Sequence, residues 1–225
     1  MEFTLVPPAP SISRPVVVTF DSDIYVFDPQ TTTFFTPSFD RWTSSDAPPY
    51  PLSVTSTSIA SSNSDSIFLF QAQERFLITM IYKLSLGRWR YGAPLKSSAT
   101  LVTNVINIDA MIYLLLGNET SLFVACYNPQ VDGWSMITWG AIPYDNIPNF
   151  YPTNVYFSGS IFFFGGQHRS PSVVTNEDYR FDNATGVVSQ ISHMSVSRMH
   201  STAVVVDDRI MSSVVRLQIK IFLML

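Results

Sequence analysis

The sequence predicts an all-β fold. Apolar residues make up 46% of the 225-residue chain and aromatic residues 14%, whereas charged residues reach only 13%, about half of the roughly 25% found in an average domain. Valine, isoleucine, phenylalanine, tyrosine, threonine and serine are abundant, and fifteen prolines interrupt them. These residue types favour strands and tight turns over solvent-exposed helices.

The charge pattern excludes several classes of partner. The net charge is −4, and the thirteen basic residues are scattered singly, so we expect no binding to nucleic acid or to anionic lipid. The one cysteine, Cys126, rules out an intramolecular disulfide framework. The N-terminus lacks the basic and apolar regions of a secretory signal, and no apolar run approaches the ~18 residues of a membrane span. The sequence therefore predicts a cytoplasmic protein.

Five similar segments recur along the chain, each with an isoleucine after a small or acidic turn. The isoleucines lie 43, 45, 49 and 49 residues apart and are Ile24, Ile67, Ile112, Ile161 and Ile210. Three residues before each one stands a residue with a short side-chain oxygen, namely Asp21, Ser64, Asp109, Ser158 or Asp207. Such oxygens close hairpin turns by bonding nearby backbone N–H groups, so each segment is predicted to be a hairpin.

A second anchor follows the isoleucine in each unit. It is a tryptophan at Trp42, Trp89 and Trp134, and Val188 takes its place in the next unit. A periodic aromatic residue is typical of packing. We therefore expect the tryptophans to fill the space between neighbouring sheets rather than to stack on a ligand.

A period of ~40 to ~50 residues with about four short strands is typical of a β-propeller blade. The sequence predicts about four to five blades over residues 15–211, after a leader at residues 1–14 and before an atypical hydrophobic tail at residues 212–225 that alternates like a strand. Two alternatives remain open. The ring is closed, with PVVVTF contributing a strand, or the chain is a truncated propeller.

Residues 157–211 carry the most complete unit. A diglycine follows IFFF, a tyrosine and an aspartate precede the anchor, and a methionine, an arginine and a histidine lead into the apolar strand; these are Gly165, Gly166, Tyr179, Asp182, Met194, Arg198 and His200. Their order resembles a kelch repeat, the unit of kelch-type and galactose-oxidase-like propellers. The resemblance is weaker elsewhere, because Gly117 stands alone before Asn118 and Val188 replaces the tryptophan.

The sequence offers no catalytic or metal-binding pattern. The three histidines, His168, His193 and His200, form no HxxxH pair, and no CxxC occurs, so we expect no metal and no cofactor. The resemblance to galactose oxidase implies a copper-radical alternative that would use Cys126. That cysteine lies within the predicted strand LFVACYNP, where a lone cysteine is typically a small buried apolar residue.

The candidate binding residues are arginines in or near loops. The kelch resemblance implies that loops between strands bind partners, and it assigns such a role to Arg198 and His200. Arg41, Arg88 and Arg90 flank the tryptophans. Their alternative role is exposure to solvent or local pairing with Asp40 or Asp46.

The function expected from these observations is a non-catalytic protein–protein interaction module that presents loops to a protein or peptide. Two alternatives remain, a galactose-oxidase-like enzyme or carbohydrate binder, and a truncated product without independent function. The glycosylation sequons at Asn118 and Asn183 matter only if the chain is secreted.

Overall fold

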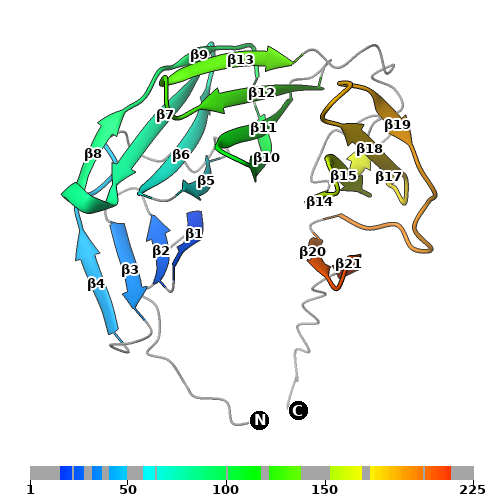
Figure 1. Ribbon diagram of the computed structural model, residues 1–225, viewed down its shortest axis with the longest axis horizontal. Coiled ribbons are helices and arrows are strands. Elements are labelled where there is room, and N and C mark those ends of the chain that lie inside the picture. The colour runs from blue at the N-terminus through cyan, green and yellow to red at the C-terminus, as the bar shows by residue number, and fades with distance from the viewer. Residues whose placement is uncertain are drawn as a thin grey trace, which may run out of the picture. The chain divides into compact units, whose positions relative to one another are not determined.

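The structure is a computed structural model, and it describes residues 16–21, 23–27, 32–36, 41–49, 58–63, 65–99, 101–117, 122–137, 153–168, 173–199 and 201–213 (Figure 1). These residues form strands joined by turns, with one short 3-10 helix, η2 (Leu84–Leu86), and no α-helix among them. The prediction of an all-β fold is confirmed. No helix in the described ranges is long and apolar enough to cross a membrane. The chain divides into two compact units, Met1–Thr138 and Trp139–Leu225.

The first unit contains three antiparallel sheets, in which the main strands pair in chain order. The first sheet consists of β1 (Val16–Phe20), β2 (Asp23–Phe27), β3 (Thr32–Thr36) and β4 (Arg41–Ser45). The second consists of β5 (Ser58–Asn63), β6 (Ser66–Gln73), β7 (Phe76–Lys83) and β8 (Arg88–Tyr91), with the short β9 (Leu95–Lys96) also paired to β7. The third consists of β10 (Leu101–Ile108), β11 (Met111–Gly117), β12 (Leu122–Asn128) and β13 (Gly133–Ile137). The leading strands are neighbours, since β5 contacts both β1 and β10.

The second unit contains a fourth sheet of the same kind and two hairpins. The fourth sheet consists of β14 (Thr153–Phe157), β15 (Ser160–Phe164), β18 (Asp178–Asp182) and β19 (Val188–Gln190). A small hairpin, β16 (Gln167–His168) with β17 (Val173–Val174), is inserted between β15 and β18. The β20–β21 hairpin, formed by β20 (Thr202–Val206) and β21 (Arg209–Ser213), lies beside β14.

The turn that joins the first two strands has a left-handed backbone in the first, third and fourth sheets and in the β20–β21 hairpin. Aspartate or serine takes up this conformation at Asp21 (φ 50°), Asp109 (φ 53°), Ser158 (φ 48°) and Asp207 (φ 46°). Two-residue hairpins require such positive φ values because their twist then matches that of the strands, and aspartate tolerates them better than most residues. The predicted hairpin turns are therefore confirmed at these four positions, and the fifth, Ser64, lies outside the described residues.

The core of the first unit lies between its sheets. Strand β6 is buried on both faces, because Ile67 and Leu69 pack toward β2 of the first sheet while Phe68 and Phe70 pack toward β11 and β12 of the third. The repeated isoleucines occupy equivalent places, and Ile67, Ile112 and Ile161 are at most 2% exposed, whereas Ile24 and Ile210 are half-buried.

Trp89 joins the second sheet to the first. Its ring lies 5.0 Å from that of Tyr82 in its own sheet and 5.5 Å from that of Phe27 in the first sheet. Its indole Nε1 donates a hydrogen bond of 3.0 Å to the carbonyl of Asp46, which follows the last strand of the first sheet. Trp89 therefore contacts the first sheet both through its ring and through a hydrogen bond.

Trp134 repeats the arrangement one sheet later. Its ring lies 4.9 Å from that of Tyr127 and 5.7 Å from that of Phe70, and its Nε1 donates to the carbonyl of Ala93 at 2.8 Å. The interplanar angle to the phenylalanine is 74° in both cases. The two sheet-to-sheet contacts are therefore built on one plan. Trp42 is half-buried in β4.

Candidate functional site

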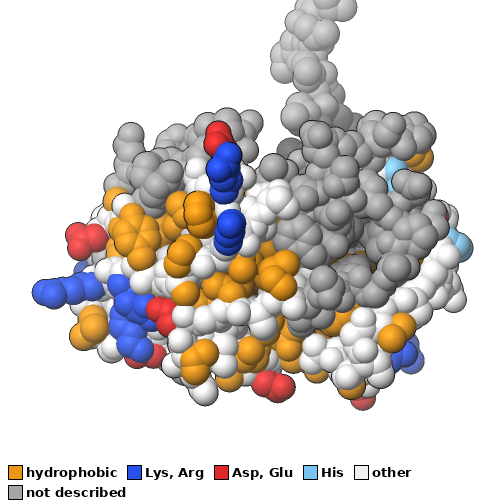
Figure 2. Space-filling model, turned by 90° about the horizontal axis from the view of Figure 1, so that it is seen from above, with side chains coloured by type: hydrophobic (Ala, Val, Ile, Leu, Met, Phe, Trp, Pro, Cys, Tyr) orange, Lys and Arg blue, Asp and Glu red, His pale blue; other side chains and the backbone are white. Residues whose placement is uncertain are grey.

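Three of the four arginines proposed from the sequence to bind a partner lie on the last strands of the first two sheets. Arg41 begins β4, and Arg88 and Arg90 lie in β8, all three exposed. Exposed apolar side chains accompany them, among them Tyr91 at 53% and Phe76 at 47%. Figure 2 shows basic and apolar side chains interspersed on the face of the molecule that it presents.

A pocket of about 420 Å³ opens between turns of the second and third sheets, within the range of roughly 300–1,000 Å³ typical of ligand sites. Its described lining comes from the end of β5, from the β10–β11 turn and from the β12–β13 turn, and consists of Asn63, Asn107, Asp109, Ala110, Met111, Ile112, Pro129 and Gln130. The described lining therefore combines amide side chains and one carboxylate with apolar side chains.

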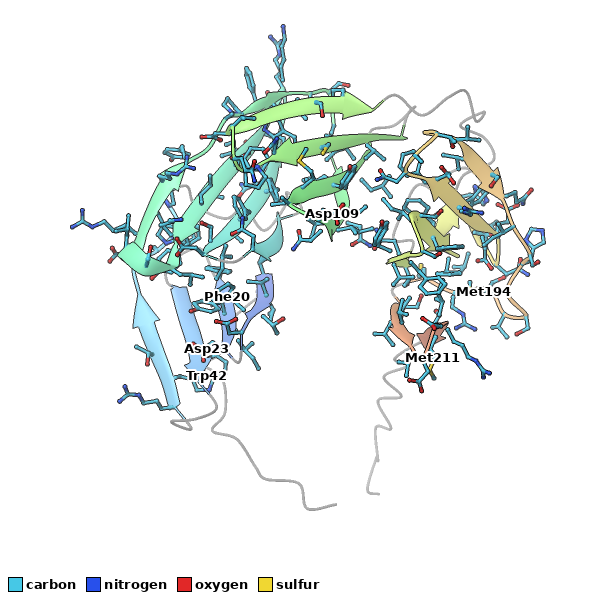
Figure 3. All side chains as sticks on the ribbon, in the orientation of Figure 1. Phe20, Asp23, Trp42, Asp109, Met194 and Met211 are labelled. Carbon is cyan, nitrogen blue, oxygen red and sulfur yellow. The ribbon has the colours of Figure 1, made fainter. Side chains whose placement is uncertain are left out.

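Asp109 is the charged residue of this lining. It occupies the turn between β10 and β11, where Figure 3 marks it, and its left-handed backbone leaves the side chain exposed. Within the described part of the chain, it forms no hydrogen bond or ion pair. The Asn63 side chain, in contrast, is fixed by hydrogen bonds: its Oδ1 accepts the N–H groups of Asp65 and Ser66 at 3.3 and 3.1 Å.

The pocket lies where the third sheet lacks a hydrogen bond that the second and fourth sheets form. In the second sheet, the N–H that follows the third strand, that of Leu84, donates to the carbonyl of Asp65 in the first turn at 3.1 Å. In the fourth sheet, the N–H of Asn183 donates to the carbonyl of Gly159 at 3.1 Å. These bonds tie the two turns of each sheet together.

Pro129 takes this position in the third sheet, and proline has no N–H to donate. The carbonyl of Ala110 corresponds to the acceptor carbonyls of Asp65 and Gly159 in the other two sheets. It therefore lacks the N–H donor that those carbonyls have. The ladder also opens one position earlier than in the second and fourth sheets, since pairing of β11 with β12 begins at Ile112 and Tyr127, just as pairing of β2 with β3 begins at Ile24 and Phe35 in the first sheet. Pro37 has the same place in the sequence of the first sheet but lies outside the described residues. The missing hydrogen bond therefore coincides with the pocket.

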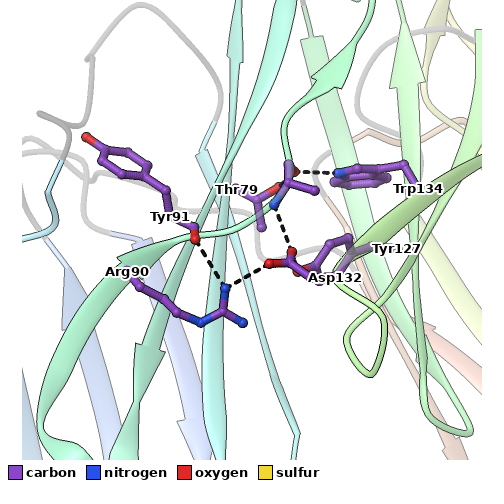
Figure 4. Close-up of polar contacts among 7 residues, drawn as sticks. Thr79, Arg90, Tyr91, Tyr127, Asp132 and Trp134 are labelled. Carbon is purple, nitrogen blue, oxygen red and sulfur yellow. Dashed lines mark hydrogen bonds and ion pairs between the residues drawn. The ribbon is translucent and has the colours of Figure 1, made fainter.

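The first unit also contains a polar network that joins the second and third sheets (Figure 4). Tyr127, fully buried, donates a short hydrogen bond to Asp132 Oδ1, which also accepts the N–H of Ala93 at 2.8 Å. Arg90 pairs with Asp132 Oδ2 at 2.9 Å, and of the two local partners expected from the sequence, Asp40 lies outside the described residues. Burial acts to raise the pKa of Asp132, but the hydrogen bonds from Tyr127, Ala93 and Arg90 hold it below its usual value. Every member of the network has a structural partner.

Arg198 lies at the centre of contacts in the second unit. Its guanidinium donates to the carbonyls of Ser212 at 3.1 Å and Val196 at 3.4 Å. Its backbone carbonyl accepts the N–H of Gly166 at 2.7 Å, and its N–H donates to Thr175. The candidate binding residue His200 lies outside the described residues, so the pair expected from the sequence cannot be placed together.

The diglycine provides the conformation that these contacts need. Gly165 has φ 60° and Gly166 has φ 108°. A Cβ on Gly165 would lie 2.3 Å from the carbonyl oxygen of Arg198, so the close approach of the two chain segments requires glycine there.

Asp178 is a buried carboxylic acid beside the diglycine. It is 3% exposed, and its Oδ1 accepts the N–H of Gly165 at 3.3 Å. Burial raises its pKa to about 6, against the opposing effects of the Gly165 and Met194 N–H groups and the charges of His193 and Arg198. Nearby, Glu177 accepts from Tyr179 and contacts His168, each at 3.2 Å.

The described residues contain no cluster of metal ligands. No three histidine, cysteine, aspartate or glutamate side chains come together there as a metal site. Cys126 is buried in β12 without a disulfide, and burial raises the pKa of its thiol.

No protein-family model and no curated protein matches this sequence. Among solved structures, the chain is similar to the structure of YjhT, with a TM-score of 0.67 and 11% sequence identity. The similarity covers 92% of this chain and 74% of the YjhT chain. At this identity, the likeness concerns the fold alone.

The pocket residues were not singled out as a site from the sequence. Asp109 was recognised only as a turn residue, and Asn63, Asn107 and Gln130 carried no motif. The signal available in the sequence was Pro129, which follows the third strand of its sheet at the position where Leu84 and Asn183 stand in the second and fourth sheets.

Proposed function

We propose that this chain is a non-catalytic protein-interaction module built as a kelch-like β-propeller, and that its partner binds at the pocket between the turns of the second and third sheets. The observation that carries the proposal is the coincidence of this pocket with the position where Pro129 cannot form the turn-to-turn hydrogen bond of the second and fourth sheets. A local departure from the rules that the rest of a structure follows is typical of a functional site.

The four-stranded antiparallel sheets support the blade interpretation. Four sheets follow one strand plan, and β20–β21 supplies the first two strands of a fifth. The adjacency of β1, β5 and β10 and the repeated tryptophan contacts are what stacked blades require. This supports a propeller of four to five blades.

Rigid sheets with variable turns suit a binding module, because loops held by a rigid scaffold carry recognition. Arg41 and Arg88 are exposed and remain candidates for partner contact, although Arg41 also has an interaction within the protein. Arg90 and Arg198 are already engaged with Asp132 and with backbone carbonyls, so a partner that used them would compete with these contacts.

The experiment is a selection of peptides from a random phage-displayed library on the immobilised full chain, followed by isothermal titration of the enriched peptides. We expect enriched sequences that bind in solution and that lose affinity when pocket residues are changed. A selection that enriches no peptide above an empty support would contradict the interaction-module proposal.

A further inference from the structure

The pocket of the third sheet has a charge that selects among ligands. Asp109 is the one charged residue of its described lining, and the other polar side chains there are the neutral amides of Asn63, Asn107 and Gln130. No lysine or arginine belongs to this lining. A carboxylate without a cationic neighbour repels phosphates and carboxylates and attracts a cation.

The backbone adds a second acceptor. The Ala110 carbonyl belongs to the turn that lines the pocket, and Pro129 cannot supply the hydrogen bond that the corresponding carbonyls of the second and fourth sheets accept. An incoming donor can therefore bond this oxygen. Two acceptors of neighbouring residues suit a ligand group with several N–H donors in one plane.

The apolar part of the lining suits an aliphatic stem. Met111, Ile112 and Pro129 contribute hydrocarbon surface to the pocket. Arginine combines a methylene stem, which packs on apolar surface, with a planar group of five donors. Lysine offers a point charge without the planar donor geometry.

We infer that the pocket receives the arginine side chain of a peptide partner. The guanidinium bonds the Asp109 carboxylate and the Ala110 carbonyl, and the stem lies against Met111 and Pro129. This inference rests on the proposed function as an interaction module and names the chemical group that the partner presents.

The direct test uses N-acetyl-arginine amide as the probe. The full chain is labelled with ¹³C at methionine methyl groups, and the Met111 signal is followed during titration, with the fully buried Met80 as the internal reference. We expect a saturable shift of Met111. The uncharged N-acetyl-citrulline amide should bind about tenfold more weakly or worse, because its bonds lack charge assistance. No shift, or equal responses to both compounds, would overturn the inference.

Matched variants separate the pocket charge from turn geometry. Asp109→Asn removes the charge while asparagine tolerates the left-handed turn, so we expect about a tenfold loss of arginine-amide binding. Asp207→Asn makes the same change at an equivalent left-handed turn (φ 46°) outside the pocket lining and should leave binding unchanged. Equal binding by both variants and the wild type would contradict the role of Asp109.

A third variant tests the opening itself. Pro129→Leu supplies the N–H that Leu84 supplies in the second sheet, and it should close the turn, protect the new amide from hydrogen exchange and abolish the Met111 shift. A protected amide with undiminished binding would overturn the inference.

The inference and the proposed function fail in different ways. If selected peptides bind the wild type and Asp109→Asn equally, the chain remains an interaction module but the arginine pocket is wrong. If Met111 responds to the arginine amide while no peptide is selected, the pocket binds arginine but the module proposal is wrong.

Discussion

The residues that recur in each repeat have two roles: the aspartates form hairpin turns, and the tryptophans join neighbouring sheets. Asp21, Asp109 and Asp207 accept left-handed backbone at hairpin turns, where a β-branched residue would be strained. Trp89 and Trp134 each pack in a cluster of aromatic rings and also donate a hydrogen bond to the preceding sheet. Both kinds of residue recur at the repeat period because each sheet poses the same geometric problem.

Trp134→Ala should lower the free energy of unfolding of the first unit by about 3 to 5 kcal/mol, because it removes a large ring from the contact with Phe70 and Tyr127. Trp134→Phe is the control. It keeps a ring but loses the hydrogen bond to Ala93, for a cost of about 1 kcal/mol. Urea unfolding measures both, and a neutral alanine variant would contradict the packing role.

Gly165→Ala should destabilise the second unit by about 3 kcal/mol or more, since the added Cβ would lie 2.3 Å from the Arg198 oxygen at a residue with φ 60°. Gly159→Ala has a comparable φ of 79° but meets no atom within 4 Å, so it should cost only about 1 kcal/mol. Thermal melting compares the two. Similar losses would show that strain, rather than the close approach, dominates.

At the scale of elements, strands that occupy equivalent positions in different sheets pair in the same order but carry different side chains. The second and fourth sheets tie their turns together through backbone bonds, and in the second sheet Asp65 adds an ion pair to Lys83. The third sheet has Pro129 instead and opens. The fourth sheet has a feature of its own. Asp178, the first residue of β18, is a buried acid that accepts a hydrogen bond from the diglycine segment.

Asp178 should make the second unit less stable as pH rises. Its folded-state pKa of about 6 exceeds the unfolded value of about 3.9, so the folded state binds the proton more tightly. The resulting stability is present below pH ~4 and is lost as pH rises through ~6, a change of about 3 kcal/mol.

Asp178→Asn isolates this effect, because the other titrating groups remain in both proteins. The unfolding free energies of wild type and variant should differ by a constant amount below pH ~4 and diverge in favour of the variant toward pH 7. Chemical unfolding at several pH values makes the comparison. Parallel curves over this range would show that Asp178 titrates normally.

For the whole molecule, the repeats place most apolar side chains between sheets, but the β20–β21 hairpin leaves several exposed. Val204, Val205, Val206 and Met211 are 49%, 39%, 45% and 58% exposed. Among the described strands, β21 pairs only with β20. An exposed apolar strand edge promotes association.

We therefore expect concentration-dependent self-association, measured by light scattering. Met211→Lys should reduce it, because a charge on an edge strand opposes pairing with another chain. Val187→Lys is the control, since Val187 is 57% exposed but lies outside the strands, just before β19. A monomer at every concentration, or equal effects of both variants, would contradict this expectation.

The sequence was sufficient to predict the all-β fold and the hairpin turns, because strand propensity and turn chemistry are local properties, and residues such as Ile112 and Asp109 recur every 43 to 49 residues. It also pointed to the tryptophans as packing residues. It did not reveal the partners of Arg90 and Arg198. Asp132 lies 42 residues from Arg90, and Ser212 lies in β21, 14 residues from Arg198, so only the chain's path brings these groups together.

The candidate pocket shows the same division most clearly. Composition and periodicity determined that the chain forms repeated antiparallel sheets, since these depend on neighbours a few residues apart. The tertiary structure alone decided that Asn63, Asp109 and Pro129 surround one space. Their proximity depends on the stacking of two sheets and on a hydrogen bond that proline cannot form, and neither effect is expressed in the local sequence of any one strand.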